Sequence, residues 1–454
     1  MASSVDSWSI SDSAWRHVMT NEVAIIGGGI SGLAAAYRLS VSHGITADVF
    51  ESESGVGGRA STVMLDGRPL NTGAQFIADF YTETLDLVSQ LDLNRAVAQR
   101  SQTACIVRNK VPQPLWPVSA LLKSPALSWR AKFRLLGVLP NLVRTWRDLD
   151  VHNLARSIRY DRKTVSEAIR ESCGEEDVDY FFGPLLRALL YWDAETTSMT
   201  VANAALKAFL TNERTLQFPE GIQRLATRLA EHTNILPQTR IVKVTRQGNG
   251  FLLATESGRV AGPYPAIVLA VPAPLALPIF DELDSFPFLR TVQYSSSVHL
   301  ALDVDGQDPD YPKGATLFPL SARPEIASFN PTYEPVSQGR RLISVFLSDA
   351  GYRELAELSD EDLALRAMEI LTSQTRKLSW ADSAQRAYCQ RWEYALPRFN
   401  VGYVANLEKF KRDFKLPGVA LAGDYLSAPY VEGAVSSGNA AAERVAHEFR
   451  NRVH

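Results

Sequence analysis

A glycine-rich turn near the N-terminus is the first feature of this sequence whose spacing could do chemistry. Gly27, Gly29 and Gly32 form a GxGxxG pattern that encloses Ile30 and Ser31. The first glycine permits a tight turn, the second lets the backbone approach a pyrophosphate, and the third lets a helix pack closely on a strand. A helix that begins here would offer its unpaired N–H groups to phosphate oxygens. The turn therefore predicts a dinucleotide-binding site.

The elements around this turn must position it, and their order fits that role. Residues 22–26 (EVAII) are apolar and predict a buried parallel strand, which a helix over 33–39 and a second strand over 47–51 follow. Glu51 ends the second strand 19 residues after Gly32, where a carboxylate can accept hydrogen bonds from ribose hydroxyls. This order favours a βαβ dinucleotide-binding unit, but it does not distinguish NAD from FAD.

Two more glycine-containing segments follow, GVGGR at 55–59 and NTGAQF at 71–76. With them the chain resembles the superfamily of flavin-containing amine oxidases, protoporphyrinogen oxidases and phytoene desaturases. In that superfamily a GGR segment runs beside the flavin pyrophosphate and a DxG turn lies against the isoalloxazine ring; here Asn71 replaces the usual Asp. Arg59 can pair with phosphate oxygens. The cofactor-binding residues that the resemblance implies in this part of the chain are Glu51, Ser52, Gly58, Arg59, Gly73, Ala74 and Gln75.

The resemblance returns in the middle and near the C-terminal end of the chain. Residues 418–443 predict a buried strand, a loop and a helix. In the superfamily, the acid after this strand meets the ribityl or phosphate region of the flavin. The N–H groups of the helix start point at the pyrimidine end, where they would stabilise negative charge. The residues concerned are Gly423, Asp424, Glu432, Gly433, Ala434 and Val435, together with Ile241, whose backbone usually meets the adenine.

These matches imply FAD as the cofactor and an α/β fold class. The resemblance implies a Rossmann-like FAD-binding domain of the GR2 type, interleaved with an α+β substrate-binding domain that carries a mixed sheet and a helical subdomain. The FAD-binding domain is expected at 1–90, 205–290 and 390–454, and the substrate-binding domain at 91–204 and 291–389. Within the latter, the patterns predict helices at 166–173, 176–191 and 360–378 and strands at 297–303 and 341–347. Proline-containing breaks are expected at 112–117 and 308–313.

Composition excludes several other functions. The chain has 454 residues, 46% of them hydrophobic and 21% charged, which is typical of an ordered globular protein. A net charge of −3 gives no attraction to nucleic acid. Cys105, Cys173 and Cys389 lie far apart, which excludes a disulfide framework and a Cys-rich metal site and suits the reducing cytoplasm. We expect no transmembrane helix, because no run of 18 apolar residues occurs, and a disordered lead-in at 1–20.

Charge is concentrated in one segment, 93–147, which contains ten basic residues and no Asp or Glu. Since the whole chain sums to −3, the rest of it carries a net charge of −13. Three hypotheses remain open for this segment: a solvated basic face over a helical subdomain, a peripheral contact with an anionic membrane surface, or a gate over an apolar substrate entrance. The basic residues are Arg95, Arg100, Arg108, Lys110, Lys123, Arg130, Lys132, Arg134, Arg144 and Arg147, and Trp and Leu residues lie between them.

Two tyrosines are candidate catalytic residues by resemblance. Amine oxidases place two aromatic rings opposite the flavin, where aromatic faces can orient an amine or a flat conjugated group. Tyr430 matches one of these rings, and Tyr403 can be aligned with the other, although both could instead be framework tyrosines. Gly402 stands where monoamine oxidases carry the Cys of covalent attachment, so the FAD is expected to be noncovalent.

A third candidate, His299, lies on the strand where typical amine oxidases carry a Lys near flavin N5. That strand, 294–300, reads YSSSVHL and has no Lys, a feature shared with porphyrinogen oxidases and desaturases. His299 could handle a proton or could be a buried strand histidine with both nitrogens bonded. Residues 391–399 also resemble the W-x-x-ALP segment of protoporphyrinogen oxidases.

The sequence leaves four functions open. An oxidase that removes a hydride from a C–H next to nitrogen in a fairly large apolar amine or amide, with O2 reoxidising the flavin, is the first hypothesis. A porphyrinogen-oxidase-like or desaturase-like enzyme, a redox-neutral isomerase or cyclase, and an inactive flavoprotein that binds a partner are the others. We expect a hydrophobic small-molecule substrate, no nucleic acid, no metal, and a monomer or homodimer.

Overall fold

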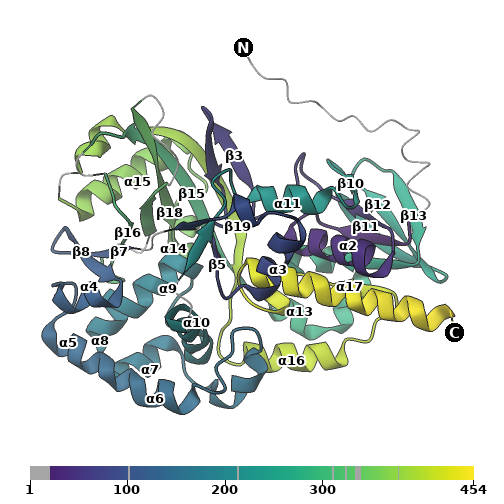
Figure 1. The fold of residues 1–454 in the computed structure, drawn as a ribbon, viewed down its shortest axis with the longest axis horizontal. Coiled ribbons are helices and arrows are strands. Elements are labelled where there is room, and N and C mark those ends of the chain that lie inside the picture. Colours follow the sequence, from purple (N-terminus) through teal and green to yellow (C-terminus); the bar gives the residue numbers. More distant parts are fainter. Residues whose placement is uncertain are drawn as a thin grey trace.

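The computed structural model describes residues 21–100, 103–211, 214–308, 311–322, 325–332, 339–376 and 378–453. The predicted lead-in at 1–20 lies outside these residues. Two parts lie side by side in Figure 1: one contains a parallel sheet and the C-terminal helix, and the other contains a larger mixed sheet with a group of helices beneath it. The chain passes between the two parts several times, because each sheet takes strands from segments far apart in sequence.

The first sheet has five strands, and all neighbouring pairs are parallel. Its central strands are completely buried and, apart from Asp48 of β2, apolar, as expected for a sheet that is covered on both faces. This sheet and its helices confirm the predicted α/β class. The strand order is β10 (Asn234–Leu236), β2 (Ala47–Phe50), β1 (Val23–Ile26), β14 (Ala266–Leu269) and β20 (Val419–Leu421).

Two helices pack against each other on this sheet, α2 (Ile30–His43) and the long C-terminal α17 (Val431–Val453). Their backbones approach closely at Gly438, where a Cβ atom would lie 2.3 Å from the carbonyl oxygen of Ser31. A side chain there would force the helices apart. This contact brings the start of α17 near the glycine turn, although the two segments are some 400 residues apart in the sequence.

The second sheet has seven strands and is mixed, because β16 pairs with β7 in parallel and the other pairs are antiparallel. Helix α15 (Asp360–Gln374) packs on it, and the fully buried Trp380 lies in the core between them. The strand order is β19 (Gln385–Pro397), β15 (Tyr294–Asp305), β18 (Arg340–Leu347), β17 (Ile326–Pro331), β16 (Ala315–Leu317), β7 (Ala104–Arg108) and β8 (Val111–Trp116).

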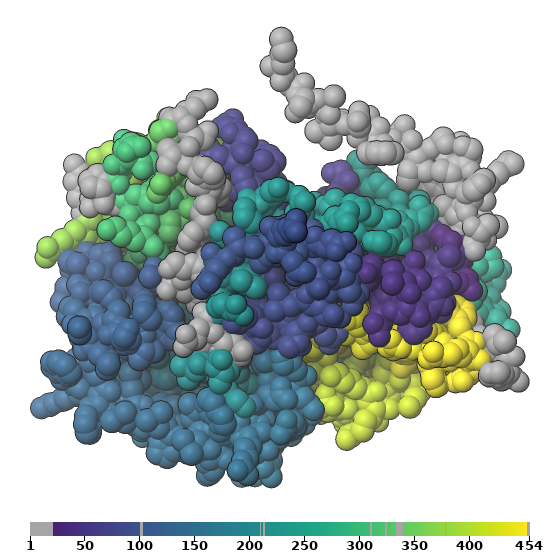
Figure 2. Space-filling model, viewed as in Figure 1, coloured from purple at the N-terminus to yellow at the C-terminus, as the bar shows by residue number. Residues whose placement is uncertain are grey.

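A group of helices forms a lobe beneath the mixed sheet (Figures 1 and 2). The predicted helix at 166–173 is confirmed as α7, and the one at 176–191 is divided by a π-helical turn at Val178–Phe182. The helices are α4 (Val118–Lys123), α5 (Trp129–Arg134), α6 (Leu139–Thr145), α7 (Val165–Ser172), α8 (Glu175–Asp177), α9 (Gly183–Leu190) and α10 (Met199–Thr211).

Small elements connect the two large sheets. An antiparallel three-stranded meander follows the middle of the chain, and short strands and helices surround the turn at 71–76. The remaining elements used below are α3 (Thr82–Gln90), β3 (Thr62–Leu65), β4 (Arg68–Asn71), β11 (Ile241–Gln247), β12 (Gly250–Thr255), β13 (Val260–Tyr264) and α16 (Tyr403–Asp413).

One expectation about local structure was wrong. The prolines at 112–117 suggested a break, but residues Val111–Trp116 form strand β8. Because β8 lies at the edge of the seven-stranded sheet, Pro112 and Pro114 need not donate to a second neighbouring strand. Strand β19 also runs without interruption across the expected domain boundary at 389/390. No helix in the described part of the chain combines the length and the apolarity that crossing a bilayer requires.

Candidate active site

The glycine turn leaves an open space at the start of α2. Gly27 has a positive φ of 108°, and a Cβ atom on Gly32 would lie 2.0 Å from the Gly27 carbonyl oxygen, so both positions require glycine. A Cβ atom on Gly29, in contrast, would meet nothing within 4 Å. No side chain caps the N-terminus of α2, and no acidic residue lies in its first turn. The free N–H groups and the open space beside Gly29 fit a pyrophosphate.

Glu51 lies directly against this turn. One of its carboxylate oxygens accepts from the Gly28 N–H at 2.7 Å, and the other accepts from the Glu53 N–H at 2.9 Å and from the Ser52 hydroxyl at 3.1 Å. The Thr239 N–H donates to the Glu51 carbonyl at 2.7 Å, which holds the segment that leads into β11 beside it. Ile241, the buried first residue of β11, therefore lies close to the acid, as a ribose and adenine site would require.

A second group of predicted residues meets about the Arg59 side chain. Its guanidinium donates two hydrogen bonds to the Asp424 carboxylate, at 2.8 and 3.1 Å, and one to the Ala395 carbonyl at 2.8 Å. The Ala74 N–H donates to the Arg59 carbonyl at 2.8 Å, which joins the two glycine-containing segments. Arg59 was expected to pair with phosphate oxygens; in the structure its partner is Asp424, which is almost completely buried. The fork-like pair connects the N-terminal and C-terminal pieces of the chain.

The turn after β4 is held by donors from two strands of the mixed sheet. The Thr72 carbonyl accepts from His299 Nδ1 at 3.2 Å and from Trp392 Nε1 at 2.9 Å. Just before it, the Asn71 side-chain oxygen accepts from the Ile222 N–H at 2.9 Å and from the Thr62 hydroxyl at 2.9 Å. The amide of Asn71 thus provides the acceptor that the more usual Asp would provide. These bonds fix the turn that carries Gly73, Ala74 and Gln75.

The carboxylate of Glu432 binds the N-terminus of α3. It accepts from the Glu83 and Thr84 N–H groups, both at 2.9 Å, and from the hydroxyls of Thr82 at 3.2 Å and Thr84 at 2.7 Å. Its side chain is thus occupied within the protein, and only its backbone is available to a ligand. Gly433 follows, where a Cβ atom would lie 1.9 Å from the Ala428 carbonyl oxygen, so this tight entry into α17 requires glycine. Ala434 and Val435 continue the first turn of the helix.

Comparison with known proteins identifies the family. A model of the family described as flavin containing amine oxidoreductase matches residues 30–446, from the start of α2 to the last turns of α17. The chain belongs to this family. It is an FAD-dependent oxidoreductase. Members of this family contain a flavin, and the βαβ unit with its open glycine turn fits the dinucleotide form of the flavin, FAD. Because Gly402 offers no thiol at the position of covalent attachment, the FAD is held noncovalently.

Relatives of more than one activity cover nearly the whole chain. A coproporphyrinogen III oxidase of Bacillus subtilis is 21% identical over 92% of this chain and 96% of its own. The mitochondrial protoporphyrinogen oxidase of Nicotiana tabacum is 23% identical over 95% of both chains. Among solved structures, the cyclohexylamine oxidase of Brevibacterium oxydans superimposes with a TM-score of 0.73, at 20% identity, over 95% of this chain and 99% of its own. The family is therefore settled, while the substrate is not.

The two tyrosines expected to flank the substrate pack in different core clusters. The Tyr430 ring stacks on Tyr81, with centroids 5.3 Å and planes 14° apart, and meets Phe80 edge to face. Tyr430 belongs to a core cluster with α2 and α3. Burial raises the pKa of both Tyr81 and Tyr430 above the usual tyrosine value, so both hydroxyls stay protonated. The aromatic neighbour of Tyr430 is thus Tyr81, a residue that the sequence motifs did not single out.

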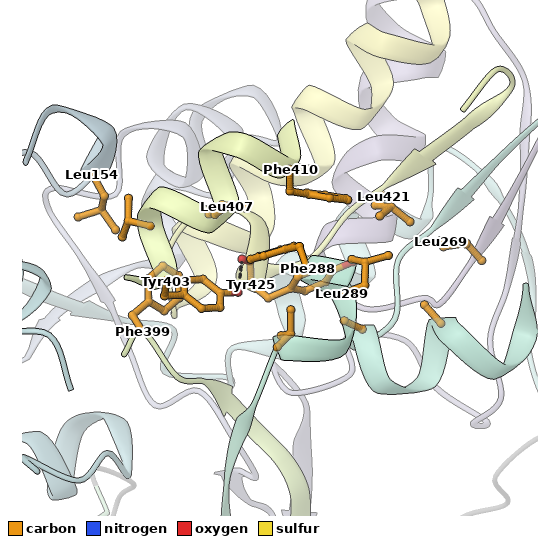
Figure 3. Packing of buried hydrophobic residues seen from close by; sticks show 14 of the residues in the cluster. Leu154, Leu269, Phe288, Leu289, Phe399, Tyr403, Leu407, Phe410, Leu421 and Tyr425 are labelled. Atoms are coloured by element: carbon orange, nitrogen blue, oxygen red, sulfur yellow. Dashed lines mark hydrogen bonds between the residues drawn. The ribbon is translucent and has the colours of Figure 1, made fainter. Parts of the chain in front are cut away.

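Tyr403 lies in a different core cluster (Figure 3). Its ring contacts Phe399 and Phe288, at centroid distances of 4.6 and 5.4 Å, and its hydroxyl donates to the Tyr425 carbonyl at 2.8 Å. The side chain is buried at the start of α16. This placement favours a framework tyrosine and not a ring beside the substrate, because every side of Tyr403 is occupied by protein.

His299 is 1% exposed and both of its ring nitrogens have partners. A carbonyl can only accept, so Nδ1 carries the proton that it donates to Thr72, and Nε2 accepts from the Ser344 hydroxyl at 2.8 Å. The ring stacks on Phe346, with centroids 4.4 Å apart. Burial lowers the pKa of His299 to about 4, although the bond to Thr72 opposes this shift. The geometry favours a neutral positioning residue over a proton carrier.

Two further tyrosines near the Arg59–Asp424 pair were not found from the sequence. The hydroxyls of Tyr294 and Tyr425 are buried and have no hydrogen-bond partner. The guanidinium of Arg59 lies 5.8 Å from the centre of the Tyr294 ring. An unpaired buried hydroxyl is costly, so these two groups are candidates for donating to a bound cofactor. Both tyrosines lie in segments discussed above, but only their position in the folded chain shows that their hydroxyls are buried and unpaired.

Proposed function

We propose that this enzyme dehydrogenates a large, apolar substrate of porphyrinogen type by removing a hydride from a C–H bond. The observation that carries the proposal is strand β15, which passes beside the Thr72 turn and contains no lysine. Where typical amine oxidases place a Lys, β15 has buried serines and the neutral His299. The Ser297 hydroxyl donates to the Leu347 carbonyl at 2.7 Å, so it is part of the sheet framework.

The chain's own residues orient and shield the substrate and perform little acid–base chemistry. FAD, when bound, supplies the hydride acceptor. Arg59 and Asp424 neutralise each other, and the N–H groups at the start of α17 favour the developing negative charge. His299 has a pKa of about 4 and two bonded nitrogens, so at neutral pH its ring is neutral and only a weak base. A substrate whose ring N–H protons can leave to water suits such a site, because no strong base is needed.

The relatives add support for this substrate class. Both of the curated relatives named above are porphyrinogen oxidases, and each aligns along more than nine-tenths of this chain. Trp392, from the W-x-x-ALP segment that resembles protoporphyrinogen oxidases, holds the Thr72 carbonyl in the structure. The proposal is therefore supported both by the position of Trp392 beside the Thr72 turn and by the activity of the similar proteins.

A second candidate is oxidation of a C–H next to nitrogen in a large apolar amine or amide, with O2 as the acceptor. Tyr430, at the position of one amine-oxidase ring, favours it. Two observations weigh against it. The Tyr403 ring is buried in a core cluster, where it is not free to contact a substrate, and β15 contains no lysine.

Anaerobic reduction of the flavin separates these candidates. The purified enzyme would be mixed without oxygen with a porphyrinogen, an alkylamine, an N-acyl amine and a polyene. The proposal expects the porphyrinogen to bleach the flavin absorbance and air to restore it. Bleaching by the amine or amide alone would favour the second candidate. If a fully loaded enzyme is bleached by none of them, redox-neutral chemistry would replace both.

We also propose that the enzyme works in the cytoplasm and touches a membrane through segment 93–147. The cysteines Cys105, Cys173 and Cys389 are all free thiols, which suits a reducing compartment. A membrane contact would place the enzyme where apolar substrates collect. Extraction of the wild-type protein from cells in low and high salt tests this location, because a peripheral protein is released by salt.

A further inference from the structure

Large apolar side chains are exposed in a row along the outer edge of the helical lobe. Helix α5, a 3-10 turn at Leu135–Val138 and helix α6 form one helical run over 129–145. Trp129 is 78% exposed, Phe133 76%, Leu136 52% and Val143 72%. Their spacing of four, three and seven residues keeps them on one face of the run. We call these four residues the outer stripe.

The outer stripe cannot turn inward, because the opposite face of the run is already packed. Ala131, Val138 and Leu142 are buried in the cores beneath. The backbone is also held from below: a Cβ atom on Gly137 would lie 2.5 Å from the Ser172 carbonyl oxygen of α7. The Lys132 ammonium lies 4.6 Å from the centre of the Trp129 ring, but no apolar side chain of the described residues covers the exposed face.

The carboxylate of Glu176, in α8, fixes the beginning of the run. Glu176 accepts from the Ser128 N–H at 2.9 Å and from the Ser128 hydroxyl at 2.6 Å, and it pairs with Arg108 at 2.6 Å. Ser128, held in this way, caps α5 by accepting from the Ala131 N–H at 3.1 Å, so the outer stripe is presented by a fixed helical segment and not by a loose loop. Figure 1 shows α5 and α6 at the margin of the molecule, far from the parallel sheet.

Basic side chains flank the outer stripe. Arg130 and Arg144 each follow a stripe residue by one position, which puts them in a neighbouring row on the same run, and both are exposed. Lys123, at the end of α4, and Arg147, just after α6, are also exposed basic residues near the ends of the run. No Asp or Glu occurs between positions 93 and 147, so the positive charge is not balanced within the segment. Exposed Trp and Phe beside unbalanced Arg are typical of surfaces that lie on anionic lipid.

We infer that the outer stripe and its flanking arginines dock this enzyme on the surface of an anionic bilayer. This inference sharpens the proposed membrane contact of segment 93–147 and does not depend on the proposed reaction. The aromatic and aliphatic side chains enter the interface between headgroups and acyl chains, and the arginines contact lipid phosphates. An acidic protein partner would match the charge, but it would not explain a continuous row of exposed large apolar side chains.

Vesicle binding of the flavin-loaded enzyme tests the inference. Wild-type protein is expected to sediment with vesicles of phosphatidylcholine and phosphatidylglycerol, to bind poorly to phosphatidylcholine alone, and to be released by salt. The variant W129S/F133S/V143S is expected to bind the anionic vesicles more weakly by about tenfold or more. The variant R130Q/R144Q should lose the preference for anionic lipid.

A matched control separates this surface from exposed apolar residues in general. Val260 and Leu365 are similarly exposed, on β13 and α15, so V260S/L365S should bind vesicles as the wild type does. Flavin content and flavin reduction in solution should be unchanged in all variants, which distinguishes failed docking from a failed catalytic proposal. Absence of wild-type binding to the anionic vesicles, or equal binding by the stripe variant, would overturn the inference. A stripe-dependent dimer that binds no vesicles would assign the surface to a second copy of the chain.

Discussion

At the scale of single residues, Gly29 and Gly32 have different reasons to be glycine. Gly32 is required by the protein itself, since a Cβ atom would collide with the Gly27 carbonyl oxygen at 2.0 Å. Gly29 has an ordinary φ of −72° and open space where its Cβ would be, so the protein alone does not require it. The free space at Gly29 is what a pyrophosphate would occupy.

The pair of substitutions G29V and G32V follows from this difference. G29V is expected to fold normally without FAD and to weaken FAD binding by about tenfold or more, because the added methyl groups fill the phosphate position. G32V is expected to weaken FAD binding and also to lower the melting temperature of the flavin-free protein, because its side chain would collide with the Gly27 carbonyl oxygen. Thermal unfolding and titration with FAD measure both effects. Normal FAD binding by G29V would show that the cofactor does not pass over this turn.

His299 makes a prediction about pH. Its pKa falls from 6.5 to about 4 on folding, so between these values the unfolded chain binds a proton that the folded chain does not. The free energy of unfolding should therefore decrease as the pH falls from 6.5 to 4, by about 3 kcal/mol from this residue. Denaturation of the wild type and of H299Q across this range checks it; the variant should show a shallower slope. Identical slopes would mean that His299 is not held neutral.

Residue roles were the part of the site that the sequence predicted least well. The glycines, Glu51, Arg59 and Asp424 could be located because they lie at the spacings of the family's motifs. In the structure Glu51 contacts the glycine turn, and Arg59 pairs with Asp424. Tyr403 and His299 could not be assigned, since a framework side chain and a reacting one differ only in what surrounds them. The roles of Tyr81 and Trp392 depend on contacts with Tyr430 and Thr72, which lie hundreds of residues away in the sequence.

At the scale of elements, the start of α17 depends on its bonds to α3. Glu432 provides two oxygens to four donors at the N-terminus of α3, and this arrangement fixes where α17 begins. An ionised acceptor is stronger than a neutral one, and a helix N-terminus favours negative charge. The Glu432 side chain therefore affects the predicted cofactor site by fixing where α17 begins.

We expect E432Q to lower the free energy of unfolding by about 1–3 kcal/mol, because a neutral amide offers one acceptor in place of a charged pair. E361Q provides the control: Glu361 is exposed and pairs with Arg386 at the surface, where ion pairs contribute little. Chemical denaturation of both variants gives the comparison. Equal, small effects in the two would remove the structural role assigned to Glu432.

Most elements could be predicted because periodicity and glycine spacing are local signals. The strands at 23–26 and 47–50 and helix α7 agree with the pattern to within one or two residues. Strand β8 could not be predicted, because its prolines are tolerated only by its edge position in a sheet whose order is not a local property. The π-helical turn that divides 176–191 likewise has no signal in hydrophobic period.

At the scale of the whole molecule, the site exists because distant pieces of chain converge. Arg59 and Asp424, 365 residues apart, form one partly buried pair, and Thr72 is held by two strands of the other sheet. The parallel sheet takes strands from the N-terminal, middle and C-terminal pieces that were expected to bind FAD. The family resemblance, and not hydrophobic pattern, allowed this convergence to be foreseen.

Removing one partner of the Arg59–Asp424 pair should affect the whole assembly. D424N is expected to destabilise the flavin-free protein by about 3 kcal/mol or more, because it leaves a partly buried guanidinium without its counter-charge. R353Q, at an exposed arginine that pairs with Asp349, should have a much smaller effect. Urea denaturation followed by tryptophan fluorescence compares them. A small loss in D424N would mean that the pair contributes little to the stability of the flavin-free protein.

The central claim is that this chain binds one FAD noncovalently across the Gly29 turn and the Arg59–Asp424 pair. The most direct measurement is the flavin content of purified protein after saturation with FAD, before and after denaturation in acid. We predict one FAD per chain, all of it released into the supernatant. Protein that takes up no flavin, or flavin that stays attached to the denatured chain, would contradict the account.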